Sequence, residues 1–386
     1  MKTLFSVILT LVLALTSIPV NAQSWGTDSH YLVLRQLADG RILPVSYQRV
    51  QMAAPLESLA DKDLQQALQL SPLGDHEGYI ASLQDAKGDT YYQNIARVPR
   101  LLRGEFASTR PEGGIDGYSI PLEETVFVVR VPVLAQTRLV LLDGSKTPLA
   151  EFDLDQLASE PSLRPADSAR AYTVTPIQVT GSPANRLDMV ILGDGYTAAE
   201  QSKFLSDTAW VTGGFFNISP LIEYMNYHNI YAIYAPSNQS GADHPLYSAG
   251  CTAGDPTCCG DPIMASDPQN GKMVDTIFDS TYCYYNIYRL LVAMDYSAIY
   301  TAAAAMPDWD EILLVVNDTT YGGSGGSIAV FSVNSNAVEI AKHEFGHSFG
   351  ELADEYDYGN PSSCNDLDGN TNNDCASNVT NATSLA

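Results

Sequence analysis

Two patterns of hydrophobic and polar positions divide this chain. In its first part, short runs alternate between the two kinds of residue with the period of a β-strand, and turn residues such as Asp39-Gly40 separate them. Strands are expected at 30–34, 91–95, 124–131 and 138–142. Short strands at this spacing favour two packed antiparallel sheets, so residues 23–157 are predicted to form an all-β sandwich domain.

The second part of the chain alternates short apolar strand patterns with helical ones. Strands are expected at 187–192, 229–234 and 311–316, and helices from 198, over 281–294 and from 335. This alternation predicts an α/β domain with a central sheet, which we assign to residues 186–386 and expect to continue beyond Ala386. The intervening segment 158–185 is rich in Ser, Pro, Ala and Thr, so it is predicted to be a linker.

The first 22 residues have the pattern of a signal peptide. Lys2 precedes an apolar run over 4–18, and Val20-Asn21-Ala22 offers the small residues that a signal peptidase recognises. The run is shorter than the roughly 20 apolar residues that a membrane span requires. We expect cleavage after Ala22, no transmembrane segment, and a mature protein that is secreted, periplasmic or attached to the cell surface.

Composition narrows the classes of function. The chain has 45 acidic and 20 basic side chains, a formal net charge of −25. Such a surface repels phosphate backbones, which argues against nucleic-acid binding as the main function. With 45% hydrophobic residues the chain can bury cores, so a globally disordered protein is also excluded.

All six cysteines lie beyond residue 250, at positions 251, 258, 259, 283, 364 and 375. In an exported protein this favours disulfides. Cys364 and Cys375 flank a loop of Asn, Asp and Gly and form the predicted local bridge, whereas a bridge between the adjacent Cys258 and Cys259 is sterically disfavoured. A thiolate zinc site is the weaker alternative, because the sequence contains no Cys-x-x-Cys spacing.

The strongest chemical pattern is His343-Glu344-Phe345-Gly346-His347, within a stretch of helical periodicity over 336–349. Residues four apart share one face of a helix, so both imidazoles can bind the same metal ion. Glu344 then lies beside the open coordination position, where a general base is needed. The pattern predicts a catalytic zinc site, and the alternative is a surface helix with two solvated histidines.

The residues downstream of this motif favour the zinc site. Gly350 follows His347 by three positions, where a sharp turn back toward a metal calls for a residue that tolerates a positive φ. The layout is close to the metzincin pattern H-E-x-x-H-x-x-G-x-x-H, but Ala353 stands where the third ligand would be. Asp354, one residue later, is the favoured third ligand, and Glu355 or a more distant residue is the alternative.

A glycine-rich segment comes shortly before the metal-binding helix. Glycines at 322, 323, 325 and 326 lead into a strand pattern over 327–331. An edge strand here would suit hydrogen bonding to an extended substrate. The candidate substrate-binding residues are Gly325, Gly326, Ser327 and Ile328, and an ordinary hairpin loop is the alternative.

Further candidate sites are less specific. Tyr356 could stabilise an oxyanion, or it could only pack the turn. The segment 366–374 offers alternating oxygen donors as calcium loops do, but it lacks the closing Glu of an EF-hand, so Ca²⁺ competes with a solvated acidic loop. Asp243 and His244 are candidates either for a structural metal site or for locking a loop.

The stretch 343–356, HEFGHSFGELADEY, resembles the signature of the IgA-peptidase family of zinc metallopeptidases. Three upstream stretches also resemble characteristic segments of that family, namely LDMVILGDGYT at 187–197, SGADHP at 240–245 and FDSTY at 278–282. The β-rich first region resembles its N-terminal domain. The resemblance implies a metzincin-like zinc peptidase domain preceded by an all-β sandwich domain, and a secreted zinc endopeptidase of bacterial type, without implying cleavage of immunoglobulin.

Two classes of function therefore compete. In the first, the protein is a zinc endopeptidase that acts on a protein or peptide substrate such as a host or environmental glycoprotein, with Glu344 moving the proton. In the second, it is an exported binding or adhesion protein with a structural metal site. Glu344 favours the first class, because a structural site needs no carboxylate beside an open coordination position.

Overall fold

The computed structural model describes residues 27–53, 56–68, 76–107, 115–165, 172–350 and 352. Several predictions from the sequence fall outside these residues, namely the signal peptide, Asp354, Tyr356, the Cys364–Cys375 bridge and the calcium loop. Within the described ranges, no helix combines the length and the apolar character needed to cross a bilayer.

Two antiparallel sheets make up most of the N-terminal β region, which we define as residues 27–165. One sheet has the order β2-β1-β7, from β1 (Thr27–Gln36), β2 (Ile42–Met52) and β7 (Thr125–Pro132). The other has the order β4-β3-β8-β9, from β3 (His76–Gln84), β4 (Thr90–Pro99), β8 (Arg138–Leu142) and β9 (Pro148–Asp153). All four strands expected in this region are confirmed.

The inward-facing residues of both sheets form one hydrophobic core. Side chains alternate between buried and half-buried along β7, as expected for a strand with one face on a core. Phe127 of β7 packs edge to face on Tyr79 of β3, with ring centroids 6.0 Å apart. Two short helices, α1 (Asp61–Ala67) and α2 (Leu154–Ser159), complete this region, together with the 3-10 turn Pro161–Leu163.

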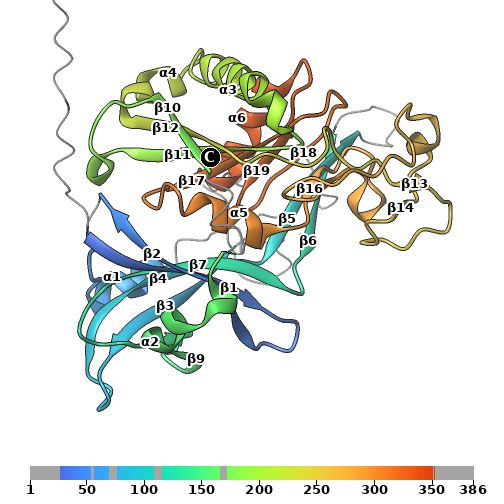
Figure 1. Ribbon diagram of the computed structural model, residues 1–386. Coiled ribbons are helices and arrows are strands. Elements are labelled where there is room, and N and C mark those ends of the chain that lie inside the picture. Colours follow the sequence, from blue (N-terminus) through green and yellow to red (C-terminus); the bar gives the residue numbers. More distant parts are fainter. Residues whose placement is uncertain are drawn as a thin grey trace, which may run out of the picture.

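A separate hairpin projects from the N-terminal β region. It consists of β5 (Leu101–Ala107) and β6 (Ile115–Pro121), which form a two-stranded sheet of their own. Figure 1 shows the hairpin extending from the N-terminal sheets to β16 and β18 of the following region. The hairpin therefore connects two parts of the molecule that are far apart in sequence.

A six-stranded sheet forms the centre of the C-terminal α/β region, residues 172–352. Its order is β10-β12-β11-β17-β19-β18. The strands are β10 (Thr173–Gln178), β11 (Leu187–Asp194), β12 (His228–Tyr234), β17 (Glu311–Val316), β18 (Gly323–Ser324) and β19 (Ala329–Ser332). The inner four strands are parallel, and the two outer strands, β10 and β18, run antiparallel to their neighbours.

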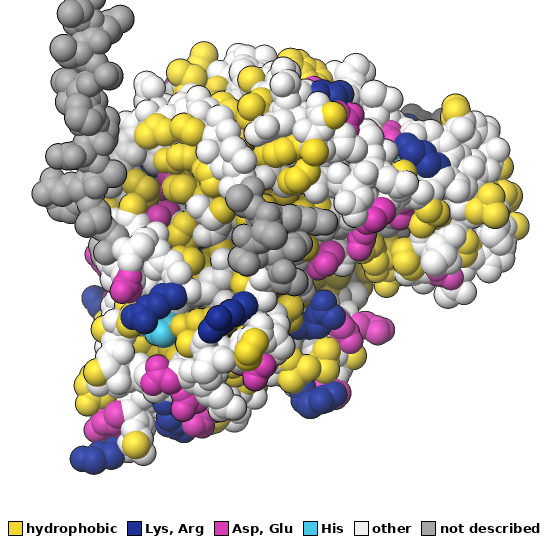
Figure 2. Space-filling view, in the orientation of Figure 1, with side chains coloured by type: hydrophobic (Ala, Val, Ile, Leu, Met, Phe, Trp, Pro, Cys, Tyr) yellow, Lys and Arg dark blue, Asp and Glu magenta, His cyan; other side chains and the backbone are white. Residues whose placement is uncertain are grey.

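Helices cover both faces of this sheet (Figure 1). On one face lie α3 (Gln201–Phe215), α4 (Leu221–Tyr224) and α6 (Ala337–Ser348). A capping box precedes α3, with Thr197 and Glu200 as its partners, and the 3-10 turn Ala198–Glu200 leads into the helix. Exposed apolar side chains gather over α3 and α4 (Figure 2), among them Trp210, Ile222 and Tyr224.

The other face of the sheet is covered by α5 (Tyr296–Ala303), which also contacts the N-terminal β region. Tyr31 of β1 is fully buried in the same hydrophobic cluster as Tyr300 of α5 and Leu314 of β17. Its hydroxyl donates to the Tyr300 carbonyl at 2.8 Å and accepts a hydrogen bond from Trp309 Nε1 at 3.1 Å. The two regions thus share a core.

Two predictions about local structure are wrong. The expected helix over 281–294 is instead β15 (Ser280–Thr281), the 3-10 turn Tyr284–Asn286 and β16 (Val292–Ala293). Positive φ angles at Cys283, Tyr285 and Asn286 are incompatible with a continuous helix. Part of the expected linker is also ordered, because β10 pairs with β12 as an outer strand of the main sheet.

The remaining short elements belong mainly to a lobe held by disulfides. It contains β13 (Leu246–Tyr247), β14 (Cys258–Cys259) and the 3-10 turn Pro262–Ser266, while the turns Pro183–Asn185 and Met225–Tyr227 flank β11 and β12. The disulfides join Cys251 to Cys258 and Cys259 to Cys283. These bonds fit an extracellular protein.

Candidate metal centre

Helix α6 presents the two histidines of the motif on one side. The helix buries Ala337, Ala341 and Phe345 against the sheet and α3, and Phe345 packs edge to face on Phe215 of α3 at 5.0 Å. This apolar stripe fixes the rotation of the helix about its axis. His343 and His347, one turn apart, are thereby brought together.

The two imidazoles are arranged as ligands of a single ion would be. His343 Nε2 and His347 Nε2 are 3.0 Å apart, and their rings lie nearly perpendicular. Two nitrogens that each bind zinc at roughly 2.0–2.1 Å are separated by about this distance. His347 Nδ1 lies 2.7 Å from the Leu352 carbonyl, which accepts its hydrogen and leaves Nε2 available to a metal. The donor set therefore fits zinc.

Glu344 lies beside this pair and against the glycine-rich segment. Glu344 is only 5% exposed to solvent. A β-carbon at Gly325 would stand 2.4 Å from Glu344 Oε2 and 3.5 Å from His347 Cδ2, and one at Gly323 would stand 3.5 Å from Glu344 Oε1. Gly323 of β18 and Gly325 just after it thus let the backbone approach the carboxylate. The sequence alone did not indicate this need for glycine.

Gly350 is required for a reason other than the predicted one. The expected positive φ is not found there. Instead, a β-carbon at Gly350 would lie 2.7 Å from the Gly346 carbonyl oxygen. Glycine is needed because the chain folds closely over the end of α6, and this brings the Leu352 carbonyl to His347.

The other candidate substrate-binding residues lie in different surroundings. Gly325 pairs through its backbone with Arg103 of β5. The Ser327 hydroxyl is 3.2 Å from the Tyr300 hydroxyl, and Ile328 is buried in the core shared by the two regions. The Ile328 side chain therefore serves packing, while the backbone at Gly325 is the part of this segment nearest to Glu344.

A cavity of about 530 Å³ lies between the two regions, next to the end of α6. Its lining includes Ser348 of α6, Ser327, Arg97 of β4 and Glu311 of β17. Burial raises the pKa of Glu311 to about 8, and the nearby Asp310 adds to this, whereas Ser348 and Arg97 oppose it. Sequence reasoning missed Glu311, because a carboxylate at the first position of a strand carries no recognisable signal.

His244 is held by protein partners on both ring nitrogens. Nδ1 lies 3.0 Å from Asp267 Oδ2, and Nε2 lies 3.2 Å from Asp318 Oδ2. Burial tends to raise the pKa of Asp318, but hydrogen bonds from His244, the Thr320 N–H and other groups lower it to about 2. The arrangement favours the loop-locking alternative for His244, and neither aspartate was identified from the sequence.

The three upstream stretches that resemble the peptidase family meet in space. Asp194, in the first stretch, accepts hydrogen bonds from the backbone N–H groups of Phe278 and Ser280 in the third. The N–H of Gly241, in the second, donates to the Gly195 carbonyl. A β-carbon at Gly195 would lie 2.0 Å from the Gly241 oxygen. These stretches therefore tie loops together at the carboxyl end of β11.

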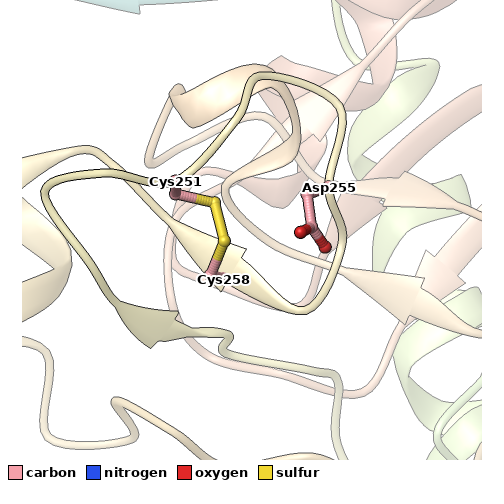
Figure 3. Close-up of side chains that lie close together, drawn as sticks. All are labelled: Cys251, Asp255 and Cys258. Carbon is pink, nitrogen blue, oxygen red and sulfur yellow. A yellow bond between two sulfur atoms is a disulfide. The ribbon is translucent and has the colours of Figure 1, made fainter.

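Among the described residues, one further group of potential metal ligands lies close together, consisting of Cys251, Asp255 and Cys258. Figure 3 shows that the two sulfur atoms are bonded to each other. The Asp255 carboxylate accepts hydrogen bonds from the N–H and the hydroxyl of Thr257. Without free thiolates the group is a poor metal site.

The sequence pattern of the IgA Peptidase M64 family matches residues 175–252 and 259–385, just over half of the chain. The match includes the three contacting stretches and the whole of α6. Among curated proteins, none matches the chain.

Proposed function

The chain belongs to the IgA peptidase M64 family, and on this premise we propose that it is a secreted zinc-dependent endopeptidase with Glu344 as general base. One observation carries the proposal, the 3.0 Å separation of His343 Nε2 and His347 Nε2 beside the buried Glu344. Membership of the family supports peptide-bond hydrolysis. The pair of imidazoles supports zinc as the metal.

Zinc would be held by His343, His347 and a third ligand, for which we propose Asp354. Leu352, two residues earlier, already contacts His347 through its carbonyl. Two imidazoles and one carboxylate leave a coordination position for water, as in catalytic zinc sites. The metal supplies Lewis acidity toward that water and toward the scissile carbonyl.

The protein's own contribution is the movement of a proton. Glu344 follows a ligand directly on the helix, so its carboxylate lies beside the metal position without replacing an imidazole. It takes one proton from the attacking water and passes it to the nitrogen of the leaving amine, so that the products are a carboxylate and an amine. Its low exposure keeps it from bulk water, and Gly323 and Gly325 leave room for it beside their backbone.

We further propose a metzincin-like α/β catalytic domain over 186–386, to whose sheet β10 of the expected linker adds an outer strand, preceded by a β-sandwich domain over 23–157. A mostly parallel sheet whose β19 leads directly into the histidine-bearing α6 supports the first. Two antiparallel sheets around one core support the second. A signal peptide over 1–22, a protein or peptide substrate and a Ca²⁺ ion at 366–374 belong to the same proposal.

The competing class is a binding protein with a structural metal site. Such a site has no use for a carboxylate beside its ligands, and Glu344 makes it the weaker candidate. The decisive experiment compares Glu344→Gln with wild type for zinc content by elemental analysis and for hydrolysis of unstructured protein. The expected result is retained zinc with a loss on the order of a hundredfold in hydrolysis. Full activity of the variant would refute the mechanism.

A further inference from the structure

The outer edge of β18 has its backbone hydrogen bonds satisfied from within the chain. Strand β19 pairs with β18 on the inner side. On the outer side, the Gly323 N–H donates to the Arg289 carbonyl at 3.2 Å, and the Gly323 carbonyl accepts from the Leu291 N–H at 3.4 Å. The groups of Gly325 that point outward are satisfied by Arg103 of β5.

The contact between Gly325 and Arg103 has the geometry of an antiparallel strand pair. The Arg103 N–H donates to the Gly325 carbonyl at 3.3 Å, and the Gly325 N–H donates to the Arg103 carbonyl at 3.2 Å. An extended peptide that adds a strand to a sheet edge uses these same two groups. Since Gly325 is also the residue that abuts Glu344, β5 lies where a peptide would pair closest to the general base.

We propose that β5 occupies the substrate strand position, and that the β5–β6 hairpin must leave β18 before an extended polypeptide can pair with Gly325. This inference rests on the proposed peptidase function. The pairing of Arg103 with Gly325 would then be an autoinhibitory contact within the chain. A bound polypeptide exchanges one strand pair for another, so the hydrogen bonds of Gly325 are kept while those of Arg103 are released.

The hairpin is attached in a way that permits such an exchange. It belongs to neither sheet of the N-terminal β region, and a small apolar cluster anchors it to the C-terminal α/β region. The cluster joins Leu102 and Ile120 of the hairpin to Leu290 and Val292. It is far smaller than the three main clusters, which contain no residue of the hairpin.

The backbone geometry offers a selective way to weaken the contact. Both the N–H and the carbonyl of Arg103 face Gly325, just after β18, so they take no part in the ladder with β6, where Arg103 is opposite Ser119. Arg103→Pro therefore removes a donor to Gly325 and leaves the hairpin ladder intact. Arg103→Ala is the matched control, because it removes the same side chain and keeps the N–H.

The test uses the full chain loaded with zinc, in a Glu344→Gln background so that the probe is not cleaved. Binding of fluorescein-labelled β-casein, an unstructured protein, is measured by fluorescence anisotropy. We expect Arg103→Pro to bind about tenfold more tightly than Arg103→Ala. Leu102→Ala, which weakens the apolar anchor without touching the backbone pair, should also tighten binding, and circular dichroism should show that all variants are folded. Equal binding by the proline and alanine variants, or no binding by either, would overturn the proposal.

Hydrogen exchange supplies a second readout that needs no variant of the hairpin. Adding casein to the Glu344→Gln protein should speed exchange at the Arg103 amide and leave the Gly325 amide protected. An Arg103 amide that stays protected while casein is bound would show that β5 is a permanent wall of the site, which contradicts the proposal.

The two proposals can fail separately. Tighter casein binding by Arg103→Pro, together with no hydrolysis by any variant that retains Glu344, would refute the peptidase and support the strand occupancy. Hydrolysis by wild type that is equally fast in the proline and alanine variants would support the peptidase and refute the occupancy.

Discussion

Gly325 lies directly against Glu344, so that a β-carbon at residue 325 would stand 2.4 Å from the Glu344 Oε2 atom. A β-carbon and a non-bonded oxygen do not approach so closely in proteins. A side chain at residue 325 must therefore displace either the carboxylate or the backbone of residue 325. The position of the Glu344 carboxylate is therefore coupled to a glycine outside α6.

Gly325→Ala should lower hydrolysis by about tenfold or more while leaving zinc content unchanged, because a misplaced base transfers protons poorly. Peptide hydrolysis and elemental analysis provide the measurements. Gly213→Ala on α3, where a β-carbon meets nothing within 4 Å, is the matched control and should retain activity. Equal activity of both variants would show that Glu344 does not depend on this contact.

The identity of the third ligand can be tested by metal content alone. Asp354→Ala should reduce bound zinc as strongly as His347→Ala does, and Glu355→Ala should leave most of it, because only the former removes a ligand. Elemental analysis after dialysis against a weak chelator is the measurement. The reverse order of Asp354 and Glu355 would move the ligand to Glu355.

Glu311 should make the protein less stable as the pH rises. Its folded pKa of about 8 exceeds the usual value of 4.5, so the folded state keeps a proton that the unfolded state releases between these values. The free energy of unfolding therefore falls by up to about 1.4 kcal/mol per pH unit in this interval. Arg97 and Ser348 on neighbouring elements reduce this effect and Asp310 adds to it.

In Glu311→Gln that pH dependence should be absent. Urea unfolding of both proteins at about pH 5 and about pH 8 gives the comparison. The free energy of unfolding of the variant, relative to that of wild type, should be higher at the higher pH. Parallel stability curves for the two proteins would mean that Glu311 ionises normally in the folded state.

Asp318 should show the opposite dependence. Its folded pKa of about 2 is below the usual 3.8, so its contribution to stability is present above pH 3.8 and is lost as the pH falls toward 2. Asp318→Asn should lower the free energy of unfolding by on the order of 2 kcal/mol at neutral pH, and the difference from wild type should shrink in acid. Denaturant unfolding at neutral and acidic pH measures both values, and a constant difference would contradict the assignment.

The elements that sequence predicted well are those whose pattern is local. The strand over 311–316 is recognisable from its own apolar run, and α6 from its periodicity and its motif. The helix predicted over 281–294 is wrong because long-range contacts decide the conformation of these residues. Cys283 is tied to Cys259, and its left-handed backbone ends any helix that the apolar spacing suggested.

The candidate site shows the same division. His343, Glu344 and His347 could be predicted because they lie within one helical turn of each other and their chemistry depends on that spacing. The pairing of Gly325 with Arg103 could not be predicted, because the two residues are far apart in the sequence and no local pattern links them. The partners of His244 were missed for the same reason, as Asp267 and Asp318 come from separate loops.

Tyr31 of β1 is buried against α5 and Trp309, and this contact matters for the design of shortened proteins. The segment that matches the peptidase family starts at residue 175, yet part of the core around α5 comes from β1 (Thr27–Gln36). The segment that carries the family pattern and the set of residues that completes this core therefore have different limits. A truncated protein that begins at the family boundary would expose the apolar face of α5 to water and would be prone to self-association.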